Sequence, residues 1–218
     1  MSYSGNVSVG GPANVRELPH LIISKLAVGP YENNTYLLRC RTSGEQLLID
    51  AANEPERLLD LIGSDGLASV VTTHGHGDHW QALAKVVSAT GARTHAHPLD
   101  AVEVPVPTDQ FVSDGDVIKL GDASLRAIHL VGHTPGSIAL LYDDPEGPPH
   151  LFTGDCLFPG GVGNTWKDPV RFASLLHDVE TKFFDVLPDE TWVYPGHGGD
   201  TTLGAERPQL AEWKARGW

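Results

Sequence analysis

Residues 73–79 concentrate metal-binding side chains in one short stretch, Thr-His-Gly-His-Gly-Asp-His. Three histidines and one aspartate fall within six residues of it: His74, His76, Asp78 and His79. Imidazole and carboxylate groups are the ligands that zinc, iron and manganese take in proteins. A histidine-rich surface tract would give a similar local pattern, but it would need no ligands elsewhere in the chain. The rest of the sequence therefore tests whether these residues belong to a built metal site.

Three further candidate ligands each follow a predicted strand and come directly after a glycine. They are His133, Asp155 and His197. The first cluster likewise follows an apolar strand, predicted over residues 67–71. Because loops on a rigid scaffold are where binding sites are built, we expect four strand ends to bring these side chains together at one edge of a sheet. The joint pattern argues against a loose surface tract.

The predicted elements mix strands with helices. Apolar and β-branched runs predict strands at 21–28, 35–40, 46–50, 67–71, 93–96, 117–120, 124–130, 138–142, 150–153 and 191–194. Helical spacing predicts a short helix beginning at Pro55, helices over 80–90 and 171–187, and a partly helical tail over 201–218. This order indicates an α/β protein with two sheets packed face to face and helices outside.

Length, charge and cysteine content narrow the class of protein. A chain of 218 residues predicts one domain, here over 20–218, after a loose Gly-, Ser-, Asn- and Pro-rich segment over 1–19. A net charge of −13 argues against binding nucleic acid or an anionic membrane, because phosphate contacts need clustered Lys and Arg. Two cysteines and the lack of a signal-peptide pattern or a long apolar run predict a cytoplasmic protein. The sequence leaves the oligomeric state open.

The order of these ligands resembles a known family. His-x-His-x-Asp-His followed by a later His, Asp and His is similar to the metallo-β-lactamase fold hydrolases, over about residues 21–207. The motifs at 132–137, 152–155 and 194–197 most resemble the glyoxalase II-like, or hydroxyacylglutathione hydrolase-like, branch. The resemblance implies a four-layer αββα sandwich of two mixed sheets flanked by helices, with a two-metal site.

The resemblance also implies a role for each candidate ligand. The first metal would be held by His74, His76 and His133. The second would be held by Asp78, His79 and His197, and Asp155 would bridge the two. Asp50, at the end of a predicted strand, matches a family aspartate that supports the metal loop from behind. Zinc is the expected metal, with iron or manganese as alternatives.

The implied activity is hydrolysis of a small-molecule thioester or ester, with a hydroxide that bridges two metals as the nucleophile. Asp78 and Asp155 are the expected catalytic carboxylates. Only 21 residues follow His197, too few for the C-terminal helical extension that helps the full-length glutathione thioesterases to hold glutathione. The sequence therefore predicts a short form and leaves recognition of glutathione open.

Two other functions fit part of the pattern. His74, His133 and Asp155 form a subset that would suit a single iron and oxygen activation, as in the persulfide dioxygenases of the same branch. A non-catalytic metal-binding module is the third interpretation. It is disfavoured because the ligand set is complete and the chain has no basic face for a partner.

Overall fold

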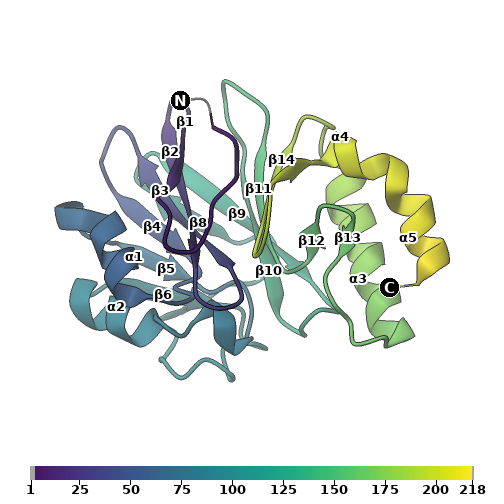
Figure 1. Ribbon diagram of the computed structural model, residues 1–218, viewed down its shortest axis with the longest axis horizontal. Coiled ribbons are helices and arrows are strands. Elements are labelled where there is room, and N and C mark those ends of the chain that lie inside the picture. Colours follow the sequence, from purple (N-terminus) through teal and green to yellow (C-terminus); the bar gives the residue numbers. More distant parts are fainter. Residues whose placement is uncertain (1–2, 218) are drawn as a thin grey trace.

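The computed structural model describes residues 3–217, in which two β-sheets pack face to face (Figure 1). The first sheet runs in the order β1-β2-β3-β4-β5-β6-β7 and the second in the order β15-β14-β11-β10-β9-β8. The first sheet consists of β1 (Asn14–Glu17), β2 (Leu21–Val28), β3 (Asn33–Cys40), β4 (Gln46–Ile49), β5 (Ser69–Val71), β6 (Arg93–Ala96) and β7 (Gln110–Phe111). The second consists of β8 (Val117–Leu120), β9 (Ala123–Leu130), β10 (Ser137–Tyr142), β11 (His150–Gly154), β14 (Trp192–Pro195) and β15 (Thr201–Thr202). A separate small hairpin pairs β12 (Leu157–Phe158) with β13 (Gly161–Val162).

Helices cover the outer face of each sheet, which makes the four-layer αββα sandwich that the sequence predicts (Figure 1). The first sheet carries α1 (Pro55–Ile62) and α2 (Leu83–Thr90). The second carries α3 (Pro169–Val179), α4 (Leu203–Glu206) and α5 (Leu210–Arg216). The two mixed sheets and their helices confirm the predicted fold class.

Three apolar layers hold these elements together. The central layer lies between the two sheets and is built from alternate residues of facing strands, among them Leu38 on β3 and Leu140 on β10. An outer layer buries Leu58 of α1 and Val86 of α2 against the first sheet. The other outer layer buries α3 and the fully buried Trp213 of α5 against the second sheet. Because burial of apolar surface is the main favourable term in folding, these layers fix the sheets that carry the site.

Strand direction places several chain turns at one edge of the sandwich. In the first sheet β4, β5 and β6 run parallel, and in the second β11 and β14 run parallel. The two sheets are tied together there, because Ile138 N donates to Thr73 O and Asn34 N donates to Gly196 O. The turns after β4, β5, β9, β11 and β14 therefore share this edge, and they carry all the candidate ligands.

Two helices begin at different residues from those expected. The helix expected from residue 171 starts at Pro169, because the Asp168 side chain caps it by accepting from Val170 N and Arg171 N. After Val179 it continues as a π-helix over Glu180–Phe184. The helix expected from residue 80 starts at Leu83, after a 3-10 turn over Gly77–His79.

The segment expected to be loose, residues 1–19, contains one strand in its described part. Residues Asn14–Glu17 pair with β2 as the antiparallel strand β1. The fully buried Lys25 of β2 donates through Nζ to Gly5 O at 2.8 Å and contacts Asp200 Oδ1 at 2.6 Å. A buried ammonium needs such acceptors, so Lys25 fastens the polar segment in addition to the apolar contacts that Tyr3 and Leu18 make with the central layer. Met1, Ser2 and Trp218, which fall in the ranges expected to be loose or partly helical, lie outside the described residues.

Across residues 3–217, none of the helices combines the length and the apolar character needed to cross a bilayer.

Candidate metal centre

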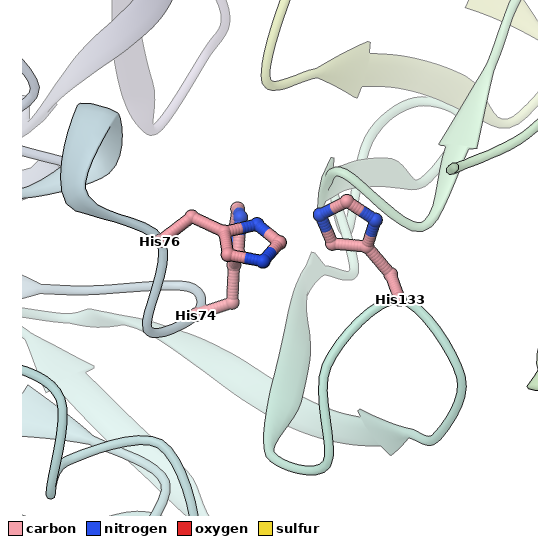
Figure 2. A group of neighbouring side chains, drawn as sticks. All are labelled: His74, His76 and His133. Carbon is pink, nitrogen blue, oxygen red and sulfur yellow. The ribbon is translucent and has the colours of Figure 1, made fainter. Parts of the chain in front are cut away.

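The structure brings all seven sequence-predicted ligands together. Ligand atoms lie within 4.8 Å of one another in three groups: His74, His76 and His133; His74, His79 and Asp155; Asp78, His79 and His197. The shared members make one continuous cluster. Figure 2 shows the first group, in which His74 and His76 come from one loop and His133 faces them from another. The second sheet thus completes a set of ligands that the first sheet begins.

Asp155 lies between the groups. Its Oδ1 is 3.4 Å from His79 Nε2, and its Oδ2 is 3.6 Å from His133 Nε2 and 3.5 Å from His197 Nε2. Asp78 lies on the far side, with Oδ2 at 3.5 Å from His197 Nε2 and at 2.9 Å from Asn33 Nδ2, which donates to it. Asp155 is therefore the carboxylate in reach of both ends of the cluster.

Hydrogen bonds behind the cluster fix which ring nitrogen faces it. His79 Nδ1 lies 2.8 Å from Asp50 Oδ2, and His133 Nδ1 lies 2.9 Å from the Asn164 carbonyl oxygen. His197 Nδ1 lies 2.8 Å from the Tyr31 carbonyl oxygen. Since these oxygens accept, each Nδ1 carries a proton and each Nε2 faces the cluster, where it can ligate a metal ion that displaces any proton on it.

Asp50 lies directly behind the loop that carries the first ligands. Its Oδ1 accepts from Thr73 N at 2.7 Å and its Oδ2 from Thr73 Oγ1 at 2.8 Å. The Thr73 hydroxyl, with its proton committed to Asp50, is left to accept from His74 Nδ1 at 3.0 Å. One buried carboxylate thus orients His79 directly and His74 through Thr73.

The polar atoms that face the centre of the cluster lack hydrogen-bond partners. Among the described residues, His74 Nε2, His79 Nε2, His133 Nε2 and Asp155 Oδ1 are buried atoms without one. A buried acceptor left unpaired costs about 1–3 kcal/mol, so four at one spot form an arrangement that would be unfavourable on its own. Three imidazole lone pairs and a carboxylate oxygen are a donor set that fits a divalent cation such as zinc or iron.

Burial and mutual charge shift the pKa values within the cluster. Burial lowers the pKa of His74 well below its usual value and that of His133 to about 4, which favours neutral rings. For His197, burial is outweighed by its contacts with Asp155 and Asp78, which raise its pKa to about 10. Burial also opposes ionisation of Asp155, but His79 and His197 hold its pKa well below the usual value. The carboxylate is therefore anionic at neutral pH.

Asp100 is a residue of the site that the sequence pattern does not predict. Its carboxylate accepts from Gly75 N at 2.9 Å and from Gly136 N at 2.7 Å. Asp100 therefore joins the turn that carries His74 and His76 to the turn that follows His133. It lies in a loop with no strand or helix period, so only the Asp-rich composition of the chain hinted at it.

Two further histidines, His95 and His97, and the cysteine that follows Asp155 lie outside the cluster. His95 Nε2 contacts Ser69 Oγ at 3.2 Å, and His97 stacks on His129. Cys156 follows Asp155 but its side chain is packed into the apolar layer under the second sheet, and burial raises its thiol pKa. Cys156 is therefore a small buried residue rather than a ligand.

A pocket of about 500 Å³ opens beside the first group of histidines. His76 and His133 line it, together with Trp80, Leu99 and Trp166. The Trp166 ring stacks on the His133 ring, with centroids 5.5 Å apart, and meets the His76 ring edge to face at 5.4 Å. A molecule in this pocket would lie directly against two of the candidate ligands.

The chain belongs to the metallo-beta-lactamase superfamily, whose family model matches residues 28–197. This is a family of metal-dependent hydrolases, and glyoxalase II homologues are among the relatives. A hydroxyacylglutathione hydrolase of Polaromonas sp. is 34% identical over 180 residues, which cover 81% of this chain and 66% of that relative. The resemblance noted from the ligand order is thus confirmed at the level of family.

Two solved structures extend the comparison. TTHA1623, described in a di-iron-bound form, has a TM-score of 0.68 and 33% identity, covering 84% of this chain and 96% of that one. ETHE1 from Myxococcus xanthus has a TM-score of 0.74 and 26% identity, covering 87% of this chain and 84% of that one. The family supports divalent metal binding by the His and Asp cluster.

Proposed function

We propose that this protein hydrolyses a small-molecule thioester or ester with two divalent metal ions, zinc in the native enzyme. The observation that carries the proposal is the convergence of buried, unpaired ligand atoms from both sheets on one spot. In this assignment His74, His76 and His133 would hold the first ion, and Asp78, His79 and His197 would hold the second. Asp155, which has His residues of both groups within 3.6 Å, would be shared between them.

Divalent ions in this setting supply Lewis-acid polarisation of a carbonyl and lower the pKa of a water molecule toward neutrality. The chain's own residues do the positioning. Asp78 is half-buried and anionic, since its contacts with His197, His79 and Asn33 hold its pKa below the usual value against the effect of burial. Asn33 Nδ2 donates to Asp78 Oδ2 and holds this carboxylate against His79 and His197. Held there, Asp78 would ligate the second ion and orient the attacking water beside it.

Asp50 and Asp100 keep the ligands in place during turnover. Asp50 holds the His79 ring and the Thr73 backbone, and Asp100 holds the Gly75 and Gly136 amides. Both carboxylates are almost completely buried. The geometry of the centre is therefore set by the scaffold before a substrate binds.

A second candidate is an iron-dependent oxygenase. It is favoured by the similarity to ETHE1 and by His74, His133 and Asp155 of the cluster, the subset that would suit one iron. The complete group of Asp78, His79 and His197 supports two ions instead, because it offers ligands for a second one.

Metal analysis of protein produced with zinc, iron and manganese supplied together separates these candidates. The proposal expects two zinc ions per chain and hydrolysis of thioesters, with S-lactoylglutathione as the first one assayed. One iron per chain with oxygen uptake on glutathione persulfide would overturn it in favour of the oxygenase. Bound metal without turnover of thioesters, esters or persulfides would leave a metal-binding module.

A further inference from the structure

The pocket beside His76 and His133 has an apolar wall held in a strained position. Trp166 and Lys167 are consecutive non-glycine residues with φ of 55° and 60°, in the left-handed region that side chains disfavour. The Trp166 side chain is 51% exposed, although a large apolar ring gains free energy by burial. Strain and exposure together at one residue of a pocket mouth point to a role in binding.

Trp166 is fastened from behind. Arg171 Cζ lies 4.5 Å from the centroid of its ring, and the His133 ring stacks against it. The Trp166 amide donates to Asn164 Oδ1 at 2.8 Å, which closes the turn that carries it. The indole is therefore a fixed surface, and its exposed side is available to a ligand in the pocket.

The charged side chains of this pocket are committed to the scaffold or are acidic. Among the described residues that line it, Arg171 is the basic one, and its Nε donates to Gly132 O at 2.7 Å while Nη2 donates to His133 O. Asp100 is occupied by two backbone amides. The remaining charged residue of the lining, Glu103, would repel an anion.

Trp80, Leu99 and Pro135 form the rest of the apolar lining of the pocket beside His76 and His133. Trp80 satisfies its indole N–H on Gly75 O at 2.9 Å, so its ring is free to pack against an apolar group. Leu99 is 54% exposed at the rim, and Pro135 adds a further apolar surface. A volume of about 500 Å³ is within the range of pockets that hold small molecules.

Resting on the proposed hydrolase function, we infer that the substrate presents an uncharged, apolar or aromatic group next to its scissile carbonyl, and that Trp166 and Leu99 select it. An anionic tripeptide thiol such as glutathione would meet two carboxylates, Asp100 and Glu103, against one cation, Arg171, in this lining. The inference therefore separates this chain from its hydroxyacylglutathione hydrolase relatives in specificity, while the hydrolytic centre stays the same.

Matched pairs of neutral thioesters test the selection. One pair is the phenylacetyl and acetyl thioesters of N-acetylcysteamine, and the other is S-benzyl and S-ethyl thioacetate, so that either side of the scissile bond is sampled. With zinc-loaded protein we expect kcat/KM to favour the aromatic member of at least one pair by tenfold or more. Trp166→Ala should reduce that ratio to threefold or less. The ratio is internal to each variant, so a general loss of activity cancels.

Phe111→Ala is the matched control. Phe111 is 58% exposed on β7 and lines no part of this pocket, so its removal should leave the ratio as in the wild type. An unchanged ratio in Trp166→Ala, or a tenfold preference for S-lactoylglutathione over every neutral thioester, would overturn the inference.

Binding measured without turnover keeps the inference testable if the hydrolase proposal fails. Calorimetric titration of the purified protein with its bound metal, using N-benzylacetamide, a neutral aromatic amide, should give an affinity at least tenfold higher than for S-methylglutathione. Trp166→Ala should weaken the binding of N-benzylacetamide at least fivefold, and Phe111→Ala should not. Equal or tighter binding of S-methylglutathione would refute the apolar selection whatever the outcome of the activity assays.

Discussion

Asp50 Oδ2 lies 2.8 Å from His79 Nδ1, and both side chains are almost completely buried. The same carboxylate accepts the Thr73 amide and hydroxyl. Asp50 has a φ of 57°, a left-handed conformation that Asp and Asn tolerate better than most residues. The strand end before the ligand loop thus places a carboxylate where it orients a ligand ring from behind.

Asp50→Asn should therefore weaken metal binding without altering the backbone. The amide keeps one acceptor but replaces the other by a donor, which faces either the Thr73 N–H or the His79 ring. Mutation of a group that hydrogen-bonds to a metal ligand typically weakens metal affinity by about 10–100-fold. Competition with a chromophoric chelator measures the loss. Asp60→Asn, at an exposed position of α1, is the control and should bind metal as the wild type does.

Asp155→Asn should lose at least one of two metal ions and nearly all turnover while the fold survives. An amide at this position contributes no charge and is a weak ligand, and His residues of both groups lie within 3.6 Å of it. We expect kcat/KM to fall by at least about 100-fold, as for residues that hold a metal centre together. Elemental analysis and circular dichroism report metal and fold separately. Full activity in this variant would remove Asp155 from the site.

Much of the site could be predicted from the sequence because its pattern is local. Each candidate ligand follows a strand, and in the second sheet each comes directly after a glycine, as in Gly154-Asp155. A strand end fixes where the next side chains lie, so four such turns in one sheet sandwich predict a common edge. The elements that carry the ligands were predicted for the same reason, since buried strands give continuous apolar runs.

What the sequence did not reveal depends on contacts between distant residues. Asp100 acts on amides 25 and 36 positions away, and no local spacing encodes that. The strand β1 lies in a polar segment, and its pairing depends on β2 and on the buried Lys25. The start of α3 is encoded by Asp168 and Pro169, a common helix-start pair. The spacing of the apolar residues alone placed the start at residue 171, two residues too late.

The buried His150 should make the stability of the metal-free protein depend on pH. Arg16 Nη1 donates to Tyr194 Oη at 2.7 Å, so the Tyr194 hydroxyl donates in turn to His150 Nδ1 at 2.8 Å. This contact suits a neutral ring. Burial, reinforced by the charge of Arg16, lowers the His150 pKa to about 4.

The direction in which the free energy of unfolding changes with pH follows from proton uptake on unfolding. An unfolded histidine has a pKa of about 6.5, so between pH 6.5 and 4 the unfolded chain binds more protons than the native one. The contribution of His150 is thus fully present above pH 6.5 and is lost as pH falls toward 4. From pH 7 to pH 5 the loss is about 2 kcal/mol, at about 1.4 kcal/mol per unit.

Urea unfolding of wild type and His150→Gln at both pH values, with chelator present, isolates this residue from the ligand histidines. The Gln carbonyl can accept from Tyr194 but does not titrate, so the variant should lose about 2 kcal/mol less than the wild type between pH 7 and pH 5. Identical pH dependence in the two proteins would show that His150 is already protonated in the folded state at pH 5.

Gly196 is the residue at which a single methyl group should disable the centre. A Cβ built there would lie 2.1 Å from Asp155 Oδ1 and 2.9 Å from His79 Cε1. Its φ lies outside the left-handed region, so alanine is permitted by the backbone and any effect comes from the clash. Gly196 N also donates to Gly154 O at 2.8 Å, so the strand end cannot move away without breaking a hydrogen bond.

Gly196→Ala should therefore displace the Asp155 carboxylate rather than the backbone. Displacements of about 1 Å at a reacting centre lower rates by about 100-fold, and we expect that loss in kcat/KM together with loss of at least one metal ion.

Gly199→Ala is the matched control, because a Cβ at Gly199 meets nothing within 4 Å and its φ is also ordinary. Since the two glycines lie three residues apart after β14, a shared loss would indicate damage to the loop. Loss confined to Gly196→Ala would instead assign the effect to contact with Asp155 and His79. Normal metal content and turnover in Gly196→Ala would mean that Asp155 has room to retreat, and would refute its assignment as the fixed bridge between the two groups of histidines.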